Sequence, residues 1–238
     1  TIDLKRIKNS VTKWIKRNQS KKYVRTDAQK ILDDQKQFWG SDGHEYIENM
    51  IINSYTDSKG YIRETPIAYD AKTSLNPEVQ DILKGFIEKL LASYPKGTRI
   101  LAEKYVYNEK EDLASTMDFV AFVPEGDSFY AEALDWKFTT IDLERTEDIP
   151  GFKQEEYKKQ MKEYVTILQR YGLKPSQIRK ARMIAFKANY EHLIPEDYKS
   201  PLILESIEVA DLDNIKDAEL YLLPVPLDFE STGNKRLD

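Results

Sequence analysis

The feature of the sequence that most constrains the fold is a change in the spacing of apolar residues at Gly97. Over 76–94 they recur every three or four positions, which predicts an amphipathic helix. Asn76, Pro77 and Glu78 mark its start, with a capping side chain, a proline at the first helical position and an early acid. Beyond this helix the pattern becomes that of strands. This succession predicts a mixed α/β domain.

Three strands are predicted beyond this helix, over 98–107, 115–123 and 128–138. The residues at 108–114 form the first connection. Pro-Glu-Gly-Asp at 124–127 is a tight turn, because these residue types suit the backbone angles that turns require. The second and third strands therefore form a hairpin.

The second half of the chain continues the alternation of helices and strands. A helix is predicted at about 152–171, followed by a strand at 181–188 and further strands at 202–210 and 218–225. The fold class is therefore α/β, with a mixed central sheet of about four to six strands flanked by helices in the order αβββαβ. The tail from 226 onwards is polar, and we expect it to be loose.

The chain before this core predicts helices. Apolar residues near 3.6 spacing predict an amphipathic helix over 2–17, and a second helix is predicted over 27–39. We expect Gly-Ser-Asp-Gly at 40–43 to break it, with Asp42 as the N-cap of a further helix from 43 to about 53. A long polar loop or small excursion then leads to the helix at Asn76.

The charge of the chain is distributed unevenly. The overall charge is −5, but residues 1–30 contain ten Lys or Arg and two Asp, which makes that segment +8 and the remainder −13. A basic arm of this kind could hold the phosphates of a nucleic acid. A solvated basic helix explains the same pattern, and both interpretations stay open.

Composition excludes several classes of protein. The chain has no Cys, which rules out disulfides, zinc fingers and cysteine-bound iron–sulfur clusters and is compatible with a reducing cytosol. It has no run of 18 apolar residues and no signal-peptide pattern at its N-terminus. We therefore expect a cytoplasmic protein without a membrane partner. The absent initiator Met suggests a processed chain or a piece of a longer one.

Candidate chemistry lies on the hairpin. With the turn centred between 125 and 126, Asp118 faces Ala133, and Asp135 is its diagonal neighbour within about 8 Å. Because strand side chains alternate, Asp118, Asp135 and Lys137 should share one patch. The residues expected on the opposite face, in the core, are Phe119, Ala121, Leu134 and Trp136.

Two neighbouring carboxylates repel each other unless one is protonated or a cation lies between them. Asp118 and Asp135 offer the oxygen ligands that a hard divalent cation prefers. Such a cation lowers the pKa of a bound water and polarises a phosphoryl oxygen, and Lys137 could orient the water or stabilise developing charge. The alternative is an ordinary surface ion pair between Asp135 and Lys137.

These residues resemble the motif of the PD-(D/E)XK nuclease superfamily, in particular its RecB-like exonuclease branch. Asp118 stands for the Asp that ends one strand, preceded by Met117 where the family often has Pro. Asp135, Trp136 and Lys137 stand for the (Asp/Glu)-x-Lys of the next strand.

Further residues extend the resemblance over roughly 40–190. Gln160 and Tyr164 match the Gln-x-x-x-Tyr motif of the branch, and their spacing places them on one helical face. His44 matches the upstream His, with Glu48 as its following acid, and Glu103 matches a Glu on the first core strand. Taken singly, each has a plainer interpretation: a helix face for Gln160 and Tyr164, a helix-start residue for His44 and a solvated side chain for Glu103.

The resemblance implies a restriction-endonuclease-like core. It divides the chain into a basic helical arm at 1–40, a nuclease core at 41–225 and the tail at 226–238. The implied ligands of Mg²⁺ or Mn²⁺ are His44, Asp118, Asp135 and the backbone carbonyl of Trp136. The implied catalytic residues are Asp118, Asp135, Lys137, Gln160, Tyr164 and Glu103.

The function implied is metal-dependent hydrolysis of DNA phosphodiester bonds, exonuclease-like, in replication, recombination, repair or phage DNA processing. The implied partners are single- or double-stranded DNA, including its ends, and a larger protein assembly in a bacterial or phage context. Two alternatives stay open. The chain could be a catalytically silent nuclease-fold module that binds DNA, or a structural or adaptor subunit of a larger particle.

Overall fold

The computed structural model describes residues 9–10, 26–108, 113–139, 151–170, 172–191 and 203–211. Within these residues, six strands form one mixed sheet. The strands are β1 Asn9–Ser10, β2 Arg99–Asn108, β3 Leu113–Glu125, β4 Ser128–Thr139, β5 Ile178–Glu191 and β6 Ile203–Asp211. The long helices are α2 Asp27–Met50, α3 Pro77–Ala92 and α4 Gly151–Arg170.

The pairing of the strands confirms the predicted mixed sheet. β1, β3, β4, β5 and β6 follow one another across it, and β2 pairs with the other edge of β3. Pairing is parallel between β1 and β3 and between β4 and β5, and antiparallel elsewhere. The sequence of elements from α3 to β5 is αβββαβ, as predicted.

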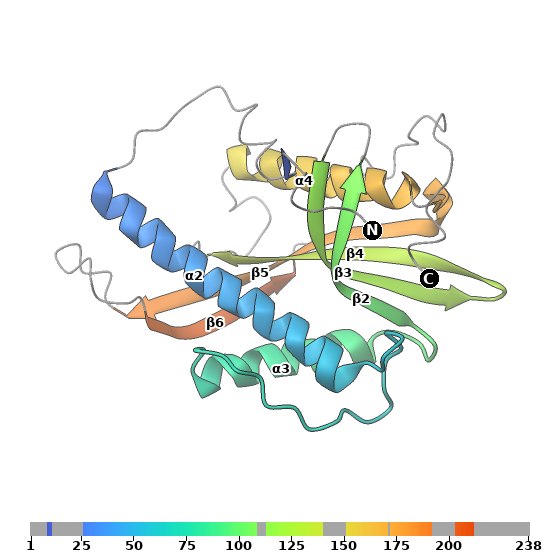
Figure 1. Cartoon of the computed structure of the whole chain (residues 1–238), viewed down its shortest axis with the longest axis horizontal. Helices are drawn as coiled ribbons and strands as arrows, with labels where there is room; N and C mark the ends of the chain where they lie inside the picture. The colour runs from blue at the N-terminus through green and yellow to red at the C-terminus, as the bar shows by residue number, and fades with distance from the viewer. Residues whose placement is uncertain are drawn as a thin grey trace.

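Helices cover both faces of the sheet. α2 and α3 lie on one face, and α4 lies on the other (Figure 1). The core beneath α2 and α3 includes Ile47, Leu83 and Trp136, all buried. A second buried cluster, centred on Met161 and Leu168, packs α4 against the opposite face. The sheet therefore separates the α2 and α3 layer from α4, and side chains from both sides can meet only around its strands.

Helix α3 begins as its sequence predicts. The side chain of Asn76 accepts a hydrogen bond of 2.9 Å from the backbone N–H of Val79, and Pro77 occupies the first helical position. Val79, Leu83 and Ile87 are fully buried, because they lie on the one face that meets the sheet. Local capping and apolar spacing thus determine this element.

The predicted break at 40–43 is wrong, because α2 runs without interruption from Asp27 to Met50 and ends in the π-helical turn Ile51–Tyr55. Asp42 is therefore not an N-cap. Its carboxylate instead accepts hydrogen bonds from the backbone N–H of Ser74, at 3.1 Å, and from the Thr73 hydroxyl, at 3.2 Å. This contact ties the middle of α2 to the chain that leads into α3.

One of the two glycines of the expected break, Gly43, allows close packing instead. A Cβ atom at Gly43 would lie 2.7 Å from Cε1 and 2.9 Å from Cε2 of the Phe138 ring on β4. Real Cβ atoms do not approach that closely, so only glycine lets α2 pack this tightly against β4. Tertiary packing has overridden the low helix propensity of glycine.

The predicted helix over 2–17 is contradicted at Asn9–Ser10, which form β1. The rest of that segment, the expected strand over 218–225 and the polar tail lie outside the described residues. The strand expected at 202–210 is confirmed as β6, and the helix expected at 152–171 is confirmed as α4. Among the described residues, no helix has the length and apolar character needed to cross a membrane.

Candidate functional site

The hairpin that carries the candidate site has a different register from the one expected. Its turn consists of Gly126, with a positive φ of 58°, and Asp127. Val120 therefore pairs with Ala133, and the expected pairing of Asp118 with Ala133 is wrong. The register differs by two residues, which preserves the alternation of faces. The four residues expected in the core are accordingly all there, namely Phe119, Ala121, Leu134 and Trp136.

Asp118 lies where β3 and β4 separate. The last described pair of their ladder is Phe119 with Leu134, and the start of β3, at Leu113, pairs with β1 instead. Where the ladder stops, Oδ2 of Asp118 accepts a hydrogen bond of 2.7 Å from the backbone N–H of Trp136. The carboxylate thus accepts a hydrogen bond from a backbone N–H group of β4 that has no carbonyl partner on β3 at this point.

His44 of α2 reaches this point from the adjacent helix. Its Nδ1 lies 2.8 Å from the carbonyl oxygen of Gly40, and its Nε2 lies 3.0 Å from that of Trp136. Nε2 also lies 3.3 Å from Oδ2 of Asp118. Because carbonyl oxygens only accept hydrogen bonds, both contacts are hydrogen bonds when both ring nitrogens carry a proton, which is the imidazolium form.

The electrostatics of this pair agree with that assignment. Burial acts against the charge on His44, but the hydrogen bond and charge of Asp118 outweigh it and raise the pKa of the imidazole to about 9. Burial likewise acts to raise the pKa of Asp118, but His44 holds it below its ordinary value. The two side chains therefore form an ion pair at neutral pH.

Asp135 forms a second ion pair on the other side of β4. Its side chain is only 1% exposed, and its Oδ2 lies 2.5 Å from Nζ of Lys137. Its Oδ1 accepts hydrogen bonds from Nε2 of Gln160, at 3.2 Å, and from the hydroxyl of Tyr164, at 3.5 Å. Burial raises the pKa of Asp135 to about 6, although Lys137 acts to lower it.

Helix α4 supplies one face to this second pair. Gln160 and Tyr164 lie together on it, as their spacing predicted, and Nε2 of Gln160 donates a 2.8 Å hydrogen bond to the Tyr164 hydroxyl. Tyr157, which was not predicted from the sequence, joins them, and its ring centroid lies 5.5 Å from Nζ of Lys137. Its position three residues before Gln160, on the same helical face, is the signal that could have identified it.

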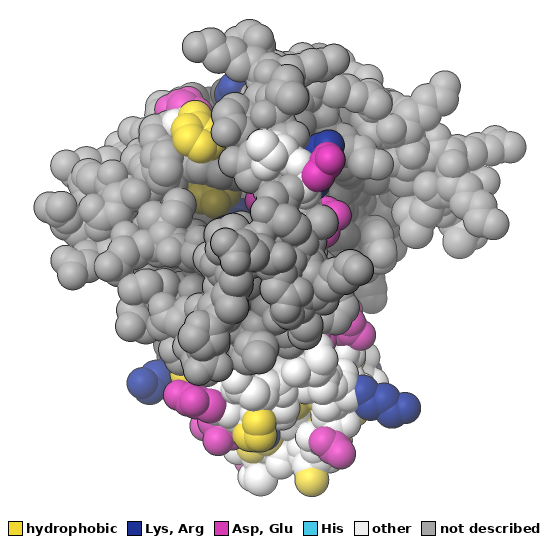
Figure 2. Space-filling view, turned by 90° about the vertical axis from the view of Figure 1, so that its left-hand side faces the viewer, with side chains coloured by type: hydrophobic (Ala, Val, Ile, Leu, Met, Phe, Trp, Pro, Cys, Tyr) yellow, Lys and Arg dark blue, Asp and Glu magenta, His cyan; other side chains and the backbone are white. Residues whose placement is uncertain are grey.

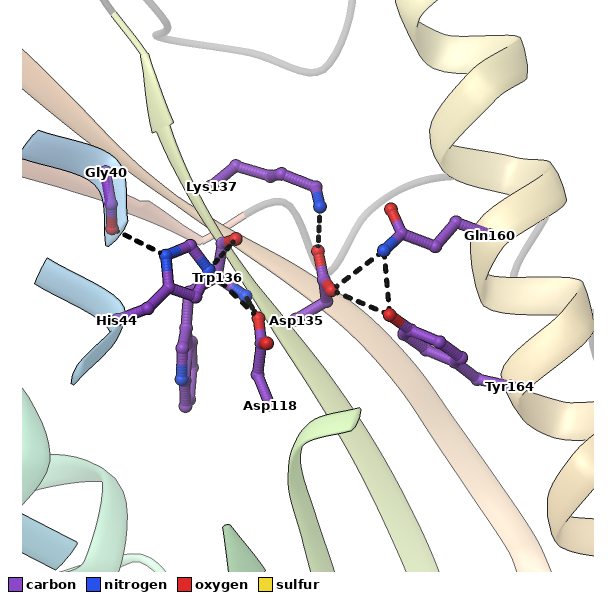
Figure 3. A network of polar contacts seen from close by, with 8 residues as sticks. All are labelled: Gly40, His44, Asp118, Asp135, Trp136, Lys137, Gln160 and Tyr164. Carbon is purple, nitrogen blue, oxygen red and sulfur yellow. Dashed lines mark hydrogen bonds and ion pairs between the residues drawn. The ribbon is translucent and has the colours of Figure 1, made fainter. Parts of the chain in front are cut away.

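The structure thus brings the expected site residues together in two adjacent groups (Figure 3). One group contains His44, Asp118 and the backbone of Trp136, and the other contains Asp135 with its partners from β4 and α4. The two carboxylates contact different partners on opposite sides of β4 rather than sharing one face. Their charges still interact, because Asp118 raises the pKa of Asp135. Glu103 belongs to β2, but its side chain lies outside the described residues.

In the first group, Nε2 of His44 lies at the spacing of metal ligands from two oxygen donors. Nε2 of His44 lies 3.0 Å from the Trp136 carbonyl oxygen and 3.3 Å from Oδ2 of Asp118. Adjacent ligands of an octahedral ion at about 2.1 Å are themselves about 3.0 Å apart. A cation could therefore replace the Nε2 proton. Within the described parts of the chain, no three His, Cys, Asp or Glu side chains cluster around such a position, so the carbonyl would have to contribute.

An open hollow along α2 gives access to His44. The residues that line it are Ser41, His44, Glu45, Glu48 and Asn49. Burial and the charges of Glu45 and Asp118 raise the pKa of Glu48. The imidazole therefore faces an acidic opening on one side and the Asp118 carboxylate on the other.

Comparison of the chain with protein-family models, with curated proteins and with solved structures finds no significant match.

Proposed function

We propose that this protein is a divalent-metal-dependent nuclease that hydrolyses DNA phosphodiester bonds in an exonuclease-like manner. The observation that carries the proposal is a pair of buried carboxylates, Asp118 and Asp135, at the point where β3 and β4 separate. Each is neutralised by a cationic side chain, His44 or Lys137. The αβββαβ order of the elements is also that of a restriction-endonuclease-like core.

A purely structural role explains this arrangement poorly. Removing an ionised group from water costs several kcal/mol per ion, in effective terms, and buried ion pairs are therefore weak stabilisers. Here four ionised side chains gather around one strand, together with the polar groups of Gln160 and Tyr164. Clusters of groups with shifted pKa values of this kind are typical of active sites.

The candidate ion is Mg²⁺ or Mn²⁺, held by His44, Asp118 and the Trp136 carbonyl. The motif adds Asp135 as the second carboxylate, from the neighbouring group. When bound, such an ion polarises a phosphoryl oxygen and lowers the pKa of water. The donor set of imidazole and oxygen ligands suits Mn²⁺ well, and Mg²⁺ through its oxygens. His44 would give up its Nε2 proton to become a ligand.

The second group supplies the positive charge for the reaction. The ammonium of Lys137 is suited to orienting a water molecule and to stabilising negative charge that develops on the phosphate. Gln160 and Tyr164 hold Oδ1 of Asp135, which leaves Oδ2 directed at Lys137. We assign Glu103 to the same machinery on the strength of the motif alone.

DNA is the partner that we propose, and the basic segment at 1–30 is the proposed guide for its backbone. We place the protein in the cytoplasm, in an assembly that processes DNA ends during replication, recombination or repair.

The test is cleavage of linear and circular DNA, single- and double-stranded, with Mg²⁺, Mn²⁺ or a chelator. We expect cleavage only with metal, none in Asp135→Asn, and a rate about 10²–10⁴-fold lower in Lys137→Ala, the usual scale for one positioned catalytic group. Asp127→Asn, in the exposed hairpin turn, is the matched control and should keep full activity. Cleavage in chelator, or by Asp135→Asn, would contradict the proposal. Metal binding without any cleavage would instead identify a catalytically silent module.

A further inference from the structure

We infer that Tyr157 is a positioning residue, whose aromatic ring holds the ammonium of Lys137 in place against Asp135. The inference rests on the proposed nuclease function. It concerns a residue outside the motifs that the sequence presents.

The geometry around Lys137 shows why a second contact matters. Its Nζ forms an ion pair with Oδ2 of Asp135, and the centroid of the Tyr157 ring lies 5.5 Å away. That separation lies within the range of about 6 Å at which an aromatic face attracts an ammonium. The lysine side chain is 23% exposed, and its flexible stem would let the ammonium swing around the carboxylate. The ring therefore restricts a group that a single ion pair would leave mobile.

Residues on one face of α4 contact two different side chains of the second group, Asp135 and Lys137. Tyr157 precedes Gln160 by three residues and Tyr164 by seven, so all three face β4. Gln160 and Tyr164 contact the carboxylate of Asp135, whereas Tyr157 contacts the ammonium of Lys137. Burial raises the pKa of the Tyr157 phenol, so the hydroxyl stays neutral. Tyr157 thus acts through its ring rather than as a charged partner.

Substitutions that keep or remove the ring test this role by kinetics. Tyr157→Phe keeps the ring, and its kcat should stay within about twofold of the wild type. Tyr157→Leu removes it, and its kcat should fall by roughly 2- to 30-fold, the scale of one cation–π contact. KM for DNA and the metal concentration for half-maximal activity should stay unchanged. Tyr69→Leu, at an exposed tyrosine between the turn Ile51–Tyr55 and α3, is the control. Equal kcat in Tyr157→Leu and the wild type would overturn the inference.

An NMR measurement tests the contact without relying on cleavage. The metal-free protein is labelled with ¹³C at lysine Cε, and Lys137→Arg identifies the signal of Lys137. Its ε protons should resonate upfield of other lysines in the wild type and in Tyr157→Phe, and return to the ordinary position in Tyr157→Leu. An ordinary position in the wild type would overturn the inference even if a variant failed to fold. A shifted signal in a protein that cleaves no DNA would overturn the nuclease function, and with it the positioning role, leaving only a packing contact.

Discussion

At the scale of single residues, His44 shows how the site balances its charges without an added ion. Its two ring nitrogens face the carbonyl oxygens of Gly40 and Trp136, and the carboxylate of Asp118 lies beside one of them. Asp118 and the Gly40 carbonyl favour a protonated ring, and their effect outweighs the cost of burying the charge. The Nε2 proton of the imidazolium therefore points to the position in which the proposed nuclease would hold a divalent cation.

The first prediction follows from this environment. In chelator, NMR titration of the ring should give His44 a pKa of about 9, and Asp118→Asn should lower that pKa toward 6.5 by removing the negative charge. The chain has two histidines, so His44→Gln assigns the signal and His192 serves as an internal reference. Titration of His44 near pH 6.5 in both proteins would contradict the ion pair.

The same pKa shift predicts how stability depends on pH. Because the pKa of His44 is raised on folding, its contribution is fully present below pH 6.5 and is lost as pH rises through 9. The free energy of unfolding in urea and chelator should therefore fall across this window, by an amount on the order of 3 kcal/mol. This window lies above the pKa of Asp135, about 6, so that carboxyl group contributes little to the change.

At the scale of secondary-structure elements, the contact between α2 and β4 places His44 in the site. Phe138 of β4 stacks on Phe186 with ring centroids 5.0 Å apart, and its ring lies 5.4 Å from that of His44. The same ring fills the space next to Gly43. The packing of one aromatic residue therefore determines how closely α2, and with it the imidazole, approaches β4.

Two glycines of α2 allow a matched test of this contact. Gly43→Ala should lower the free energy of unfolding by about 1–3 kcal/mol, because its methyl group overlaps the Phe138 ring. Gly40→Ala should raise it by about 0.5–1 kcal/mol, because a Cβ there lies 3.9 Å from Cβ of Phe138 and alanine favours the helix. Urea unfolding measures both variants. Equal effects of the two substitutions would show that close packing does not require Gly43.

At the scale of the whole molecule, charge is the feature most relevant to a nucleic-acid partner. On the face shown in Figure 2, the coloured, described residues present acidic and basic side chains interspersed, with apolar side chains standing singly. The concentrated positive charge belongs instead to residues 1–30, at +8, against −13 for the remainder. Attraction of a polyanion therefore depends on that segment.

The last prediction concerns this basic segment and the salt dependence of DNA binding. For every phosphate that the segment no longer neutralises, the slope of log affinity against log salt should decrease by roughly 0.7–0.9. The substitutions, chosen to leave β1 intact, replace with Gln the residues Lys13, Lys16, Arg17, Lys21 and Lys22. Lys72→Gln with Lys89→Gln, both exposed, forms the control. An unchanged slope in the fivefold variant would identify the segment as a solvated basic arm.

The sequence alone determined those features that depend on neighbours within a few residues. The change of apolar period at Gly97 predicts the αβββαβ order, and the cap at Asn76 predicts the start of α3. Strand alternation places Trp136 in the core and Asp135 on the opposite side of β4, and helical spacing pairs Gln160 with Tyr164. Each of these features depends on the spacing of residues that are close together in the chain, so it can be predicted from the sequence.

Only the tertiary structure decided how distant segments meet. His44 contacts the Trp136 carbonyl across 92 positions of the chain, and the pKa of its ring depends on its burial and on the charge of Asp118, another distant residue. The close approach of α2 to β4 at Gly43 is made against Phe138, and the contact of Tyr157 with Lys137 joins α4 to β4. Burial, close packing and charge pairing arise between elements. The two partners of each contact are distant in the chain, so the contact exists only in the folded protein and cannot be predicted from local sequence.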